Sequence, residues 1–348
     1  MIAFMLFAGI KIMAGDELIT EQVAITLDEP GTLGNKIGFK RKNLITNLKI
    51  EGGLDNDDMK YIREMAGCYY GDNVRYNGHL THLDLEEAWF VESGKGNITA
   101  YEKDGHTVSI SLSEPCVTYD QFIALPSLRS IVLPKYITSI KNYGFKGCEN
   151  LISVTIPSTL TEIGIYAFCN CAKLSSINLP ESLTRIDYCA FWGCCSLQSI
   201  SLPKNLTYIG FSAFSDCGKL SSVNLPESLT NISDDTFANC TGLKSIYSFN
   251  TQPISLSYYS KPFDESCYKN ATLYVPQGSK QRYAHASIWM KFEKIEEFDP
   301  TPVISVSIDN NVSETSRYSI NGQRLNSPTK GMNIVKYSDG TVKEVVVK

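Results

Sequence analysis

The chain has 348 residues, of which 43% are apolar and 20% are charged, and 32 Lys and Arg against 37 Asp and Glu give a net charge of −5. This balance excludes a strongly basic surface for nucleic acid, and the ordinary composition excludes wholesale disorder. The length predicts two or three folded units. The only long apolar run, at the N-terminus, is too short to span a bilayer.

Residues 1–14 are expected to be a signal peptide. The run from Ile2 to Ala14 has the length and apolarity of a signal-peptide core, and Ala14 is a suitable small residue for cleavage. No basic residue precedes the run and Lys11 interrupts it, so an apolar strand or helix of the mature fold is the alternative. Cleavage would leave Gly15 as the first residue of an exported chain without a membrane-spanning segment.

Residues 15–120 are expected to form an N-terminal unit of degenerate repeats and a cap. The segments 44–50 and 80–85 resemble degenerate opening turns of a repeat protein, and 80–85 is expected to form a strand. Between them, residues 57–66 place apolar side chains at helical spacing behind an acidic start, which predicts an amphipathic helix. These apolar residues are Met59, Ile62 and Met65.

Acidic residues crowd at the start of this predicted helix. Asp55, Asp57 and Asp58 could be read as part of a calcium loop, but the segment has neither the glycine nor the terminal glutamate of such a loop. Acidic residues are also favourable at a helix N-terminus, and we prefer that explanation.

Five consecutive segments of 23 residues align without a gap from residue 128 to residue 242. Proline, phenylalanine and cysteine each recur in one column. The columns are Pro134, Pro157, Pro180, Pro203 and Pro226; Phe145, Phe168, Phe191, Phe214 and Phe237; and Cys148, Cys171, Cys194, Cys217 and Cys240.

The repeat predicts a solenoid. Each segment opens with the alternation of a short strand, which the proline ends because it has no N–H for a sheet ladder. A second short extended piece, Leu-Thr-x-Ile in most segments, follows, and the stretch up to the cysteine has the spacing of a helical turn that closes the coil. One coil cannot bury its own apolar face, so neighbouring coils must stack.

The pattern LPxxLTxIxxxAFxxC, clearest at 179–194 and 202–217, resembles the BspA-like leucine-rich repeat family. The resemblance implies repeats over 121–250, a closing cap at 251–298 and related opening turns from about residue 40. The predicted fold is therefore a β-rich leucine-rich repeat solenoid with short helical turns, followed by a small C-terminal β domain at 299–348.

The chain has 11 cysteines. An even set of disulfides with one thiol left over is one interpretation. The repeat favours another, in which the five column cysteines are buried thiols that pack as small apolar groups. Zinc is a third alternative because Cys169, Cys171, Cys194 and Cys195 are dense, but no CxxC pair is present. Cys169, Cys189 and Cys195 lie beside column members and could bridge or stay free.

The C-terminal 50 residues follow a proline-rich linker at 299–302. An Asn-Gly turn at 321–322, a strand from Gly331 and a terminal valine-rich strand ending in Lys348 predict a small antiparallel sheet. These elements resemble the sorting domains of the type IX secretion system in Bacteroidota. The resemblance implies export across the outer membrane, and a β module that caps the solenoid is the alternative.

No catalytic constellation is evident. The chain has four histidines, and His79-x-x-His82 could supply two metal ligands, but this spacing on the strand predicted at 80–85 would point them to opposite faces. Nucleophile-elbow, zinc-protease and phosphate-loop motifs are absent. We therefore expect no enzyme, metal or cofactor. An enzyme site between the N-terminal unit and the solenoid, containing His79 or His106 beside a carboxylate, is the remaining alternative.

Two surfaces are candidates for binding. The first is the face of the first strand, which is polar and uncharged and suits a glycan or an extended peptide, although it has the composition of ordinary solvated strand. Its residues are Ser153, Thr155, Ser176, Asn178, Ser199, Ser201, Ser222 and Asn224. The second is an aromatic stripe of Tyr166, Tyr188 and Phe211, with Tyr143 in the same columns, which is either exposed for interaction or packed over the neighbouring coils.

The sequence as a whole predicts an exported or cell-surface binding protein. The family resemblance implies adhesion to proteins of a host or of other microbes. A glycan-binding accessory module is the alternative, and loss of sugar binding on mutation of Asn178 and Asn224 would identify its site. The ligand and the face that binds it stay open at this stage.

Overall fold

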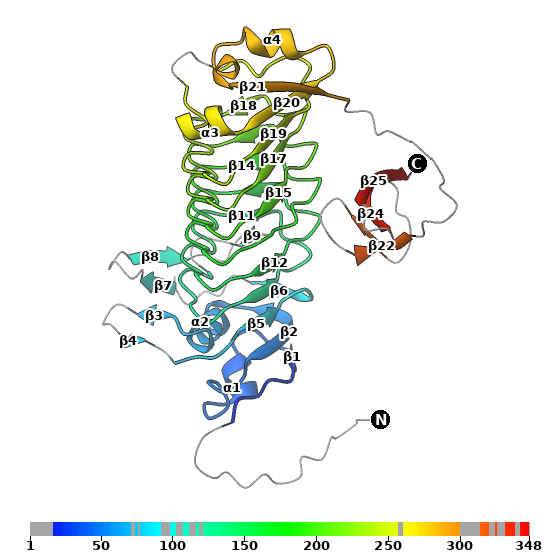
Figure 1. Cartoon of the computed structure of the whole chain (residues 1–348). Helices are drawn as coiled ribbons and strands as arrows, with labels where there is room; N and C mark the ends of the chain where they lie inside the picture. The colour runs from blue at the N-terminus through cyan, green and yellow to red at the C-terminus, as the bar shows by residue number, and fades with distance from the viewer. Residues whose placement is uncertain are drawn as a thin grey trace.

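The structure is a computed structural model that describes residues 17–70, 74–75, 77–91, 98–101, 107–110, 116–117, 121–256, 260–299, 314–319, 324–325, 331–337 and 342–347. The expected signal peptide, the Asn-Gly turn and His106 lie outside the described residues. Stacked coils form one elongated solenoid, with the N-terminal unit at one end and the helices of the C-terminal cap at the other (Figure 1). The coils that begin at Leu128, Leu151, Leu174, Leu197 and Leu220 are called coils 1 to 5.

Each regular coil contributes up to two short strands, and equivalent strands pair in parallel. The first strands lie on one face and continue from the N-terminal unit to the cap: β5 (His82–Asp84), β10 (Ser130–Val132), β12 (Ser153–Thr155), β15 (Ser199–Ser201), β17 (Ser222–Leu225), β19 (Ser245–Ser248), β20 (Thr272–Pro276) and β21 (Lys294–Phe298). The second strands form another sheet: β9 (Cys116–Val117), β11 (Ser139–Ile140), β13 (Glu162–Ile163), β14 (Arg185–Ile186), β16 (Tyr208–Ile209) and β18 (Asn231–Ile232).

Coil 3 departs from the expected pattern. The sequence predicts a first strand in every repeat, but residues 174–180 form none, so the first-strand sheet is split between β12 and β15. Within 121–256, one backbone hydrogen bond joins this segment to coil 4, from Gln198 N–H to the Ser175 carbonyl, and none joins residues 175–180 to coil 2. Ile177 and Leu179 are 5–6% exposed, whereas Val223 in coil 5 is 1% exposed. The coils therefore separate slightly on this face.

The phenylalanine column forms the centre of the core. Its rings are fully buried and stack from coil to coil, with centroids 5.1–5.5 Å apart and ring planes within 9° of parallel. The stack extends beyond the five repeats, to Phe122 before them and Phe263 after them. Sequence alignment missed these two rings because the residues around them have lost the repeat pattern.

The cysteine column is buried as expected, and the ten cysteines with described side chains are free thiols. Each column thiol also donates to the carbonyl of a column phenylalanine or its equivalent in the preceding coil, for example Cys171 Sγ to Phe145 O at 3.2 Å and Cys240 Sγ to Phe214 O at 3.1 Å. The column therefore favours a small side chain that is apolar and still carries a weak donor.

Threonines add a ladder beside the second strands. The hydroxyls of Thr161, Thr184, Thr207 and Thr230 each donate to the carbonyl of the equivalent residue 23 positions earlier, at 3.0–3.2 Å. The backbone N–H of each donates to the same carbonyl. One carbonyl thus accepts two bonds from the next coil, which fixes the coils in register.

The closing stretch of each coil has the spacing of a helical turn, and the structure forms it as overlapping three-residue turns. In coil 1, Lys146 N–H bonds Tyr143 O within the coil, whereas Phe145 N–H bonds Ala167 O of the next coil at 2.7 Å. Because N–H groups bond alternately within the coil and to the next coil, the backbone needs a residue of left-handed conformation. The equivalent residue in all five coils has φ between +50° and +62°, and none is glycine: Tyr143, Tyr166, Cys189, Ser212 and Asp235. The bonds to the next coil offset that strain.

The N-terminal unit covers the first coils with the predicted helix. Helix α2 (Asn56–Met65) is capped by Asp55, whose carboxylate accepts from Asp57 N–H and Asp58 N–H, so the helix-terminus explanation of these acids is confirmed. The unit also contains α1 (Leu33–Ile37), β1 (Val23–Leu27), β2 (Asn47–Leu54), β6 (Ala88–Phe90) and two hairpins, β3 (Tyr69–Tyr70) with β4 (Val74–Arg75) and β7 (Ile98–Tyr101) with β8 (Thr107–Ile110).

The C-terminal cap closes the core with aromatic side chains. It consists of α3 (Glu265–Asn270), α4 (Lys280–Ala284) and a short 3-10 helix, η1 (Trp289–Lys291), together with β20 and β21. After it, β22 (Glu314–Ser319), β23 (Arg324–Leu325), β24 (Gly331–Tyr337) and β25 (Val342–Val347) form an antiparallel sheet in the order β23-β22-β24-β25. The predicted hairpin of Gly331 with the terminal strand is confirmed as β24–β25.

Candidate binding surface

The first-strand face presents the predicted polar residues in two rows. Ser153, Thr155, Ser176, Asn178 and Ser199 are exposed, and Ser201, Ser222 and Asn224 are half-buried. Pairing brings Ser199 beside Ser222 and Ser201 beside Asn224. The loss of strand pairing in coil 3 leaves Ser176 and Asn178 out of both ladders. The predicted face is therefore two separate patches.

The face also extends further than the sequence indicated. Ser245 and Thr272 continue the serine row toward the cap, and Tyr247 and Tyr274 continue the row of Asn224. The two tyrosine rings stack with centroids 4.5 Å apart. Alignment missed these positions because the repeat pattern ends inside the sixth coil.

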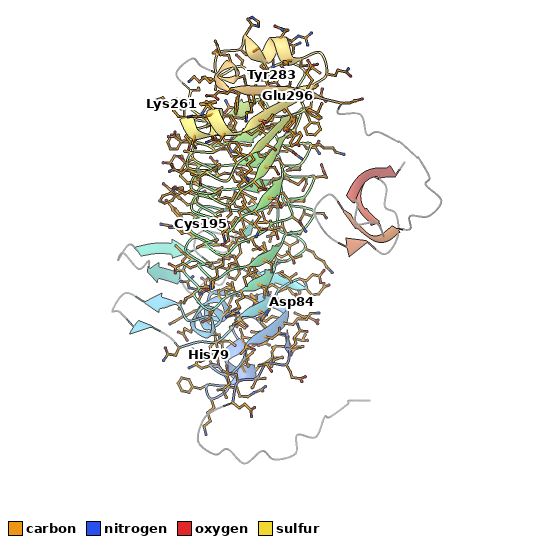
Figure 2. The ribbon with its side chains drawn as sticks, in the orientation of Figure 1. His79, Asp84, Cys195, Lys261, Tyr283 and Glu296 are labelled. Atoms are coloured by element: carbon orange, nitrogen blue, oxygen red, sulfur yellow. The ribbon has the colours of Figure 1, made fainter. Side chains whose placement is uncertain are left out.

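The aromatic stripe is a continuous stack on another flank of the solenoid, that of the closing turns. The rings of Tyr143 and Tyr166 stack at 5.4 Å, Tyr166 meets Tyr188 edge to face at 5.3 Å, and Tyr188 stacks on Phe211 at 5.2 Å. From here the name aromatic stripe means these four residues. Figure 2 places Cys195 and Lys261 on one side of the solenoid, away from Asp84 and Glu296, which lie on the first-strand side.

The stripe is both packed and partly exposed. Its rings pack over neighbouring coils, yet Tyr188 and Phe211 each remain 37% exposed, and Tyr143 and Tyr166 are half-buried. Adjacent aromatic pairs of this kind contribute about 0.5–1.5 kcal/mol each beyond burial, so the exposed edges are held rigidly. Burial and hydrogen bonding from Tyr188 raise the pKa of the Tyr166 hydroxyl, which keeps it neutral.

Charges flank the stripe. Lys146 Nζ lies 5.2 Å from the centroid of the Tyr143 ring and 5.8 Å from that of Tyr166, within the range of a cation–π interaction. On the neighbouring second strands, Arg185 lies 4.0 Å from the Tyr208 ring centroid and bonds Asp187 at 3.0 Å. Trp192, which is 37% exposed, donates its indole N–H to Asp216.

The histidines that the structure describes show no catalytic geometry. The strand predicted at 80–85 is only β5, so His79 precedes it rather than facing away from His82 on it. His79 is exposed and its Nδ1 lies 2.8 Å from Asn43 O, while His82 Nδ1 lies 2.7 Å from Thr81 Oγ1. Among the described residues, no group of three or more His, Cys, Asp or Glu side chains is placed to hold a metal ion.

A pocket of about 380 Å³ lies in the C-terminal cap. Its floor includes Ile254 and Trp289, and Arg282 and His285 stand at its rim. The described part of the chain contains no helix that is long and apolar enough to cross a membrane.

A family profile described as BspA type leucine rich repeat region matches residues 117–244 in six copies. Similar solved structures include the T. pallidum leucine rich repeat protein, at 28% identity over 53% of this chain and 80% of that one, with a TM-score of 0.38. The pneumococcal vaccine antigen PcpA is 19% identical over 73% of this chain and 57% of that one (TM-score 0.44), and a Bacteroides ovatus leucine-rich repeat protein is 21% identical over 57% and 58% (TM-score 0.33). No curated protein matches the chain.

Proposed function

We propose that this chain, in which residues 117–244 form a BspA-type leucine-rich repeat region, is an exported or cell-surface binding protein that acts as an adhesin. Its partner would be an extracellular protein of a host or of another microbe. The aromatic stripe is the observation that carries the proposal, because tyrosine is enriched among the anchors of protein interfaces. A rigid stack also loses little conformational entropy on binding.

Two sequence features support export. The apolar run at 1–14 resembles a signal peptide, and the C-terminal sheet resembles a type IX secretion sorting domain. That residues 1–14 act as a signal peptide and that the C-terminal sheet acts as a sorting domain are both part of the proposal. The repeat region supports binding in a different way, because a stack of coils offers an extended rigid surface on which contacts add up over several repeats.

A matched pair of variants tests the binding surface. Purified protein is applied to immobilised extracellular proteins and to intact cells, and Tyr188→Ser/Phe211→Ser is compared with Ile152→Ser. Ile152 is 42% exposed and lies beside the first strand of coil 2, so its loss removes a comparable apolar group outside the stripe. We expect the double variant to bind at least tenfold more weakly and Ile152→Ser to bind normally. Equal binding by all three proteins would contradict the proposal.

The glycan alternative has its own readout. If sugars bind the first-strand face, Asn178→Ala/Asn224→Ala should abolish retention on a glycan array, whereas the stripe variant should leave it unchanged. If glycans retain the wild-type protein and the stripe variant but not Asn178→Ala/Asn224→Ala, the glycan-binding accessory module replaces the protein-binding proposal.

A further inference from the structure

The charge along the aromatic stripe changes sign from one end to the other. In coil 1 the closing segment 141–148 contains no acid and two lysines, Lys146 and Lys141, and Lys141 Nζ lies 4.0 Å from a Glu162 carboxylate oxygen. In coil 5 the equivalent segment 233–240 contains Asp234 and Asp235 and no basic residue. The segments between carry no charge in coil 2 and single aspartates in coils 3 and 4, and Asp187 in coil 3 is paired with Arg185.

The acidic end is reinforced by the next turn of the chain. Asp234 is exposed, and its carboxylate accepts the backbone N–H of Lys261 at 3.0 Å. Lys261 stands on the same side of the solenoid as the closing turns (Figure 2), and its positive charge is outnumbered by Asp234, Asp235 and the acids Asp264 and Glu265 that start α3. The basic end is half-buried Lys146, positioned over the first two rings.

This arrangement is complementary to itself. A two-fold axis through coil 3, perpendicular to the stripe, exchanges coil 1 with coil 5 and coil 2 with coil 4. It would place Tyr188 against its own copy, Tyr166 against Phe211, and the Lys146 end against the Asp234 end of the second chain. The two charged ends are four coil steps apart, about 20 Å at the spacing of paired strands. An isologous dimer needs this kind of self-matching surface.

We propose that the aromatic stripe binds the stripe of a second copy of this chain, antiparallel, about a two-fold axis through coil 3. The inference rests on the proposed binding function and names its partner as the protein itself. Two displayed copies on different cells would then join the cells. The exposed ring area is small compared with the roughly 800 Å² that each partner of a stable complex buries, so the dimer is weak and forms at high local concentration.

Sedimentation of the purified full chain tests the dimer. We expect the weight-average mass to rise from the monomer value of 38.7 kDa toward twice that value as concentration increases. Tyr188→Ser/Phe211→Ser should remain monomeric, and Ile152→Ser should behave as wild type. Added salt should weaken the dimer because the end contacts are electrostatic.

Reversing the charges at the two ends of the stripe tests the antiparallel orientation of the dimer. Lys146→Glu and Asp234→Lys should each weaken association about tenfold, because each change turns two attractive contacts into repulsive ones. An equimolar mixture of the two variants should restore it, since both contacts of the mixed dimer are attractive. Restoration also shows that both variants are folded.

Several results would overturn the inference. A wild-type chain that stays monomeric up to about 1 mM, the limit of weak specific affinity, excludes the dimer. If the wild-type chain dimerises but the mixture of Lys146→Glu and Asp234→Lys does not, the antiparallel arrangement is excluded. A monomeric chain whose stripe variant still loses binding to another protein would reject the self-association and leave the proposed function standing.

Discussion

Position within the coil decides what a side chain of a given type does. Phe168 and Phe211 both belong to the closing turns, in coil 2 and coil 4. Phe168 is fully buried in the phenylalanine column, whereas Phe211 is 37% exposed at the end of the aromatic stripe. The repeat alignment places Phe168 and Phe211 in different columns. It could not predict the exposure of Phe211, because that depends on how far the neighbouring rings cover it.

The first prediction compares these two rings. Phe168→Ala should lower the free energy of unfolding by about 3–5 kcal/mol, since it leaves a cavity in a column packed on both sides. Phe211→Ala should cost less than about 1.5 kcal/mol, the value of a single stacked pair. Urea unfolding of both variants measures the difference, and equal losses would show that the stripe is part of the core.

The second prediction concerns pH and the cysteine column. Burial raises the pKa of Cys148 and Cys240 from 9.0 to about 12, and raises that of Cys171 as well. Above pH 9 the unfolded chain releases thiol protons that the folded chain retains, so stability falls as the pH rises from 9 toward 12. Each column thiol contributes a slope of about 1.4 kcal/mol per pH unit in that range.

Replacement of Cys171 by Ala isolates this effect. Its slope of unfolding free energy against pH, measured between about pH 9 and pH 11, should be shallower than that of wild type by the contribution of one thiol. An unchanged slope would mean that Cys171 does not hold its proton in the folded state.

At the scale of elements, capping contacts connect the two N-terminal helices. Asp58 accepts the backbone N–H groups of Gly31 at 2.7 Å and Leu33 at 2.9 Å, and so holds the start of α1 against the start of α2. The sequence predicted the helix and its acidic start. It could not predict the partner of Asp58, because Gly31 is 27 residues away and only the tertiary fold brings it close.

The third prediction uses this contact. Asp58→Ala should lower the free energy of unfolding by about 2 kcal/mol or more, because three backbone N–H groups, those of Gly31, Leu33 and Asp55, lose a charged acceptor. Asp57→Ala, one residue away and exposed, is the control and should cost less than about 0.5 kcal/mol. If Asp57→Ala lowers the free energy of unfolding as much as Asp58→Ala does, the loss of a negative charge at the helix N-terminus explains the effect, and the contact with Gly31 and Leu33 does not.

The fourth prediction concerns the segment of coil 3 that takes the place of a first strand. Its amides in 175–179 make no bond to coil 2, so they should exchange hydrogen for deuterium at least about tenfold faster than those of β17 in coil 5. Exchange followed by mass spectrometry of the two segments measures the ratio. Equal protection would show that the sheet is continuous in solution.

For the whole molecule, the 23-residue period predicted the stacking of the coils and the burial of the cysteine column. The shape of the first-strand face depends instead on small differences between coils, such as the separation at Ile177, which a repeated pattern cannot encode. For the same reason, alignment placed Tyr143, Tyr166, Tyr188 and Phe211 in the stripe but did not show that Lys146 lies over the first two rings. Those contacts join side chains from different columns of successive coils.

Protease treatment of intact cells of the native host tests the account of a displayed binding solenoid most directly. Mass spectrometry of the released peptides identifies the ends of the mature chain. We expect release of peptides that contain Tyr188 and Phe211, a first residue near Gly15, and loss of the tail after about Asp299. A chain that stays protected inside the cell, with Met1 and Lys348 intact, would contradict the account and assign the solenoid to an intracellular partner.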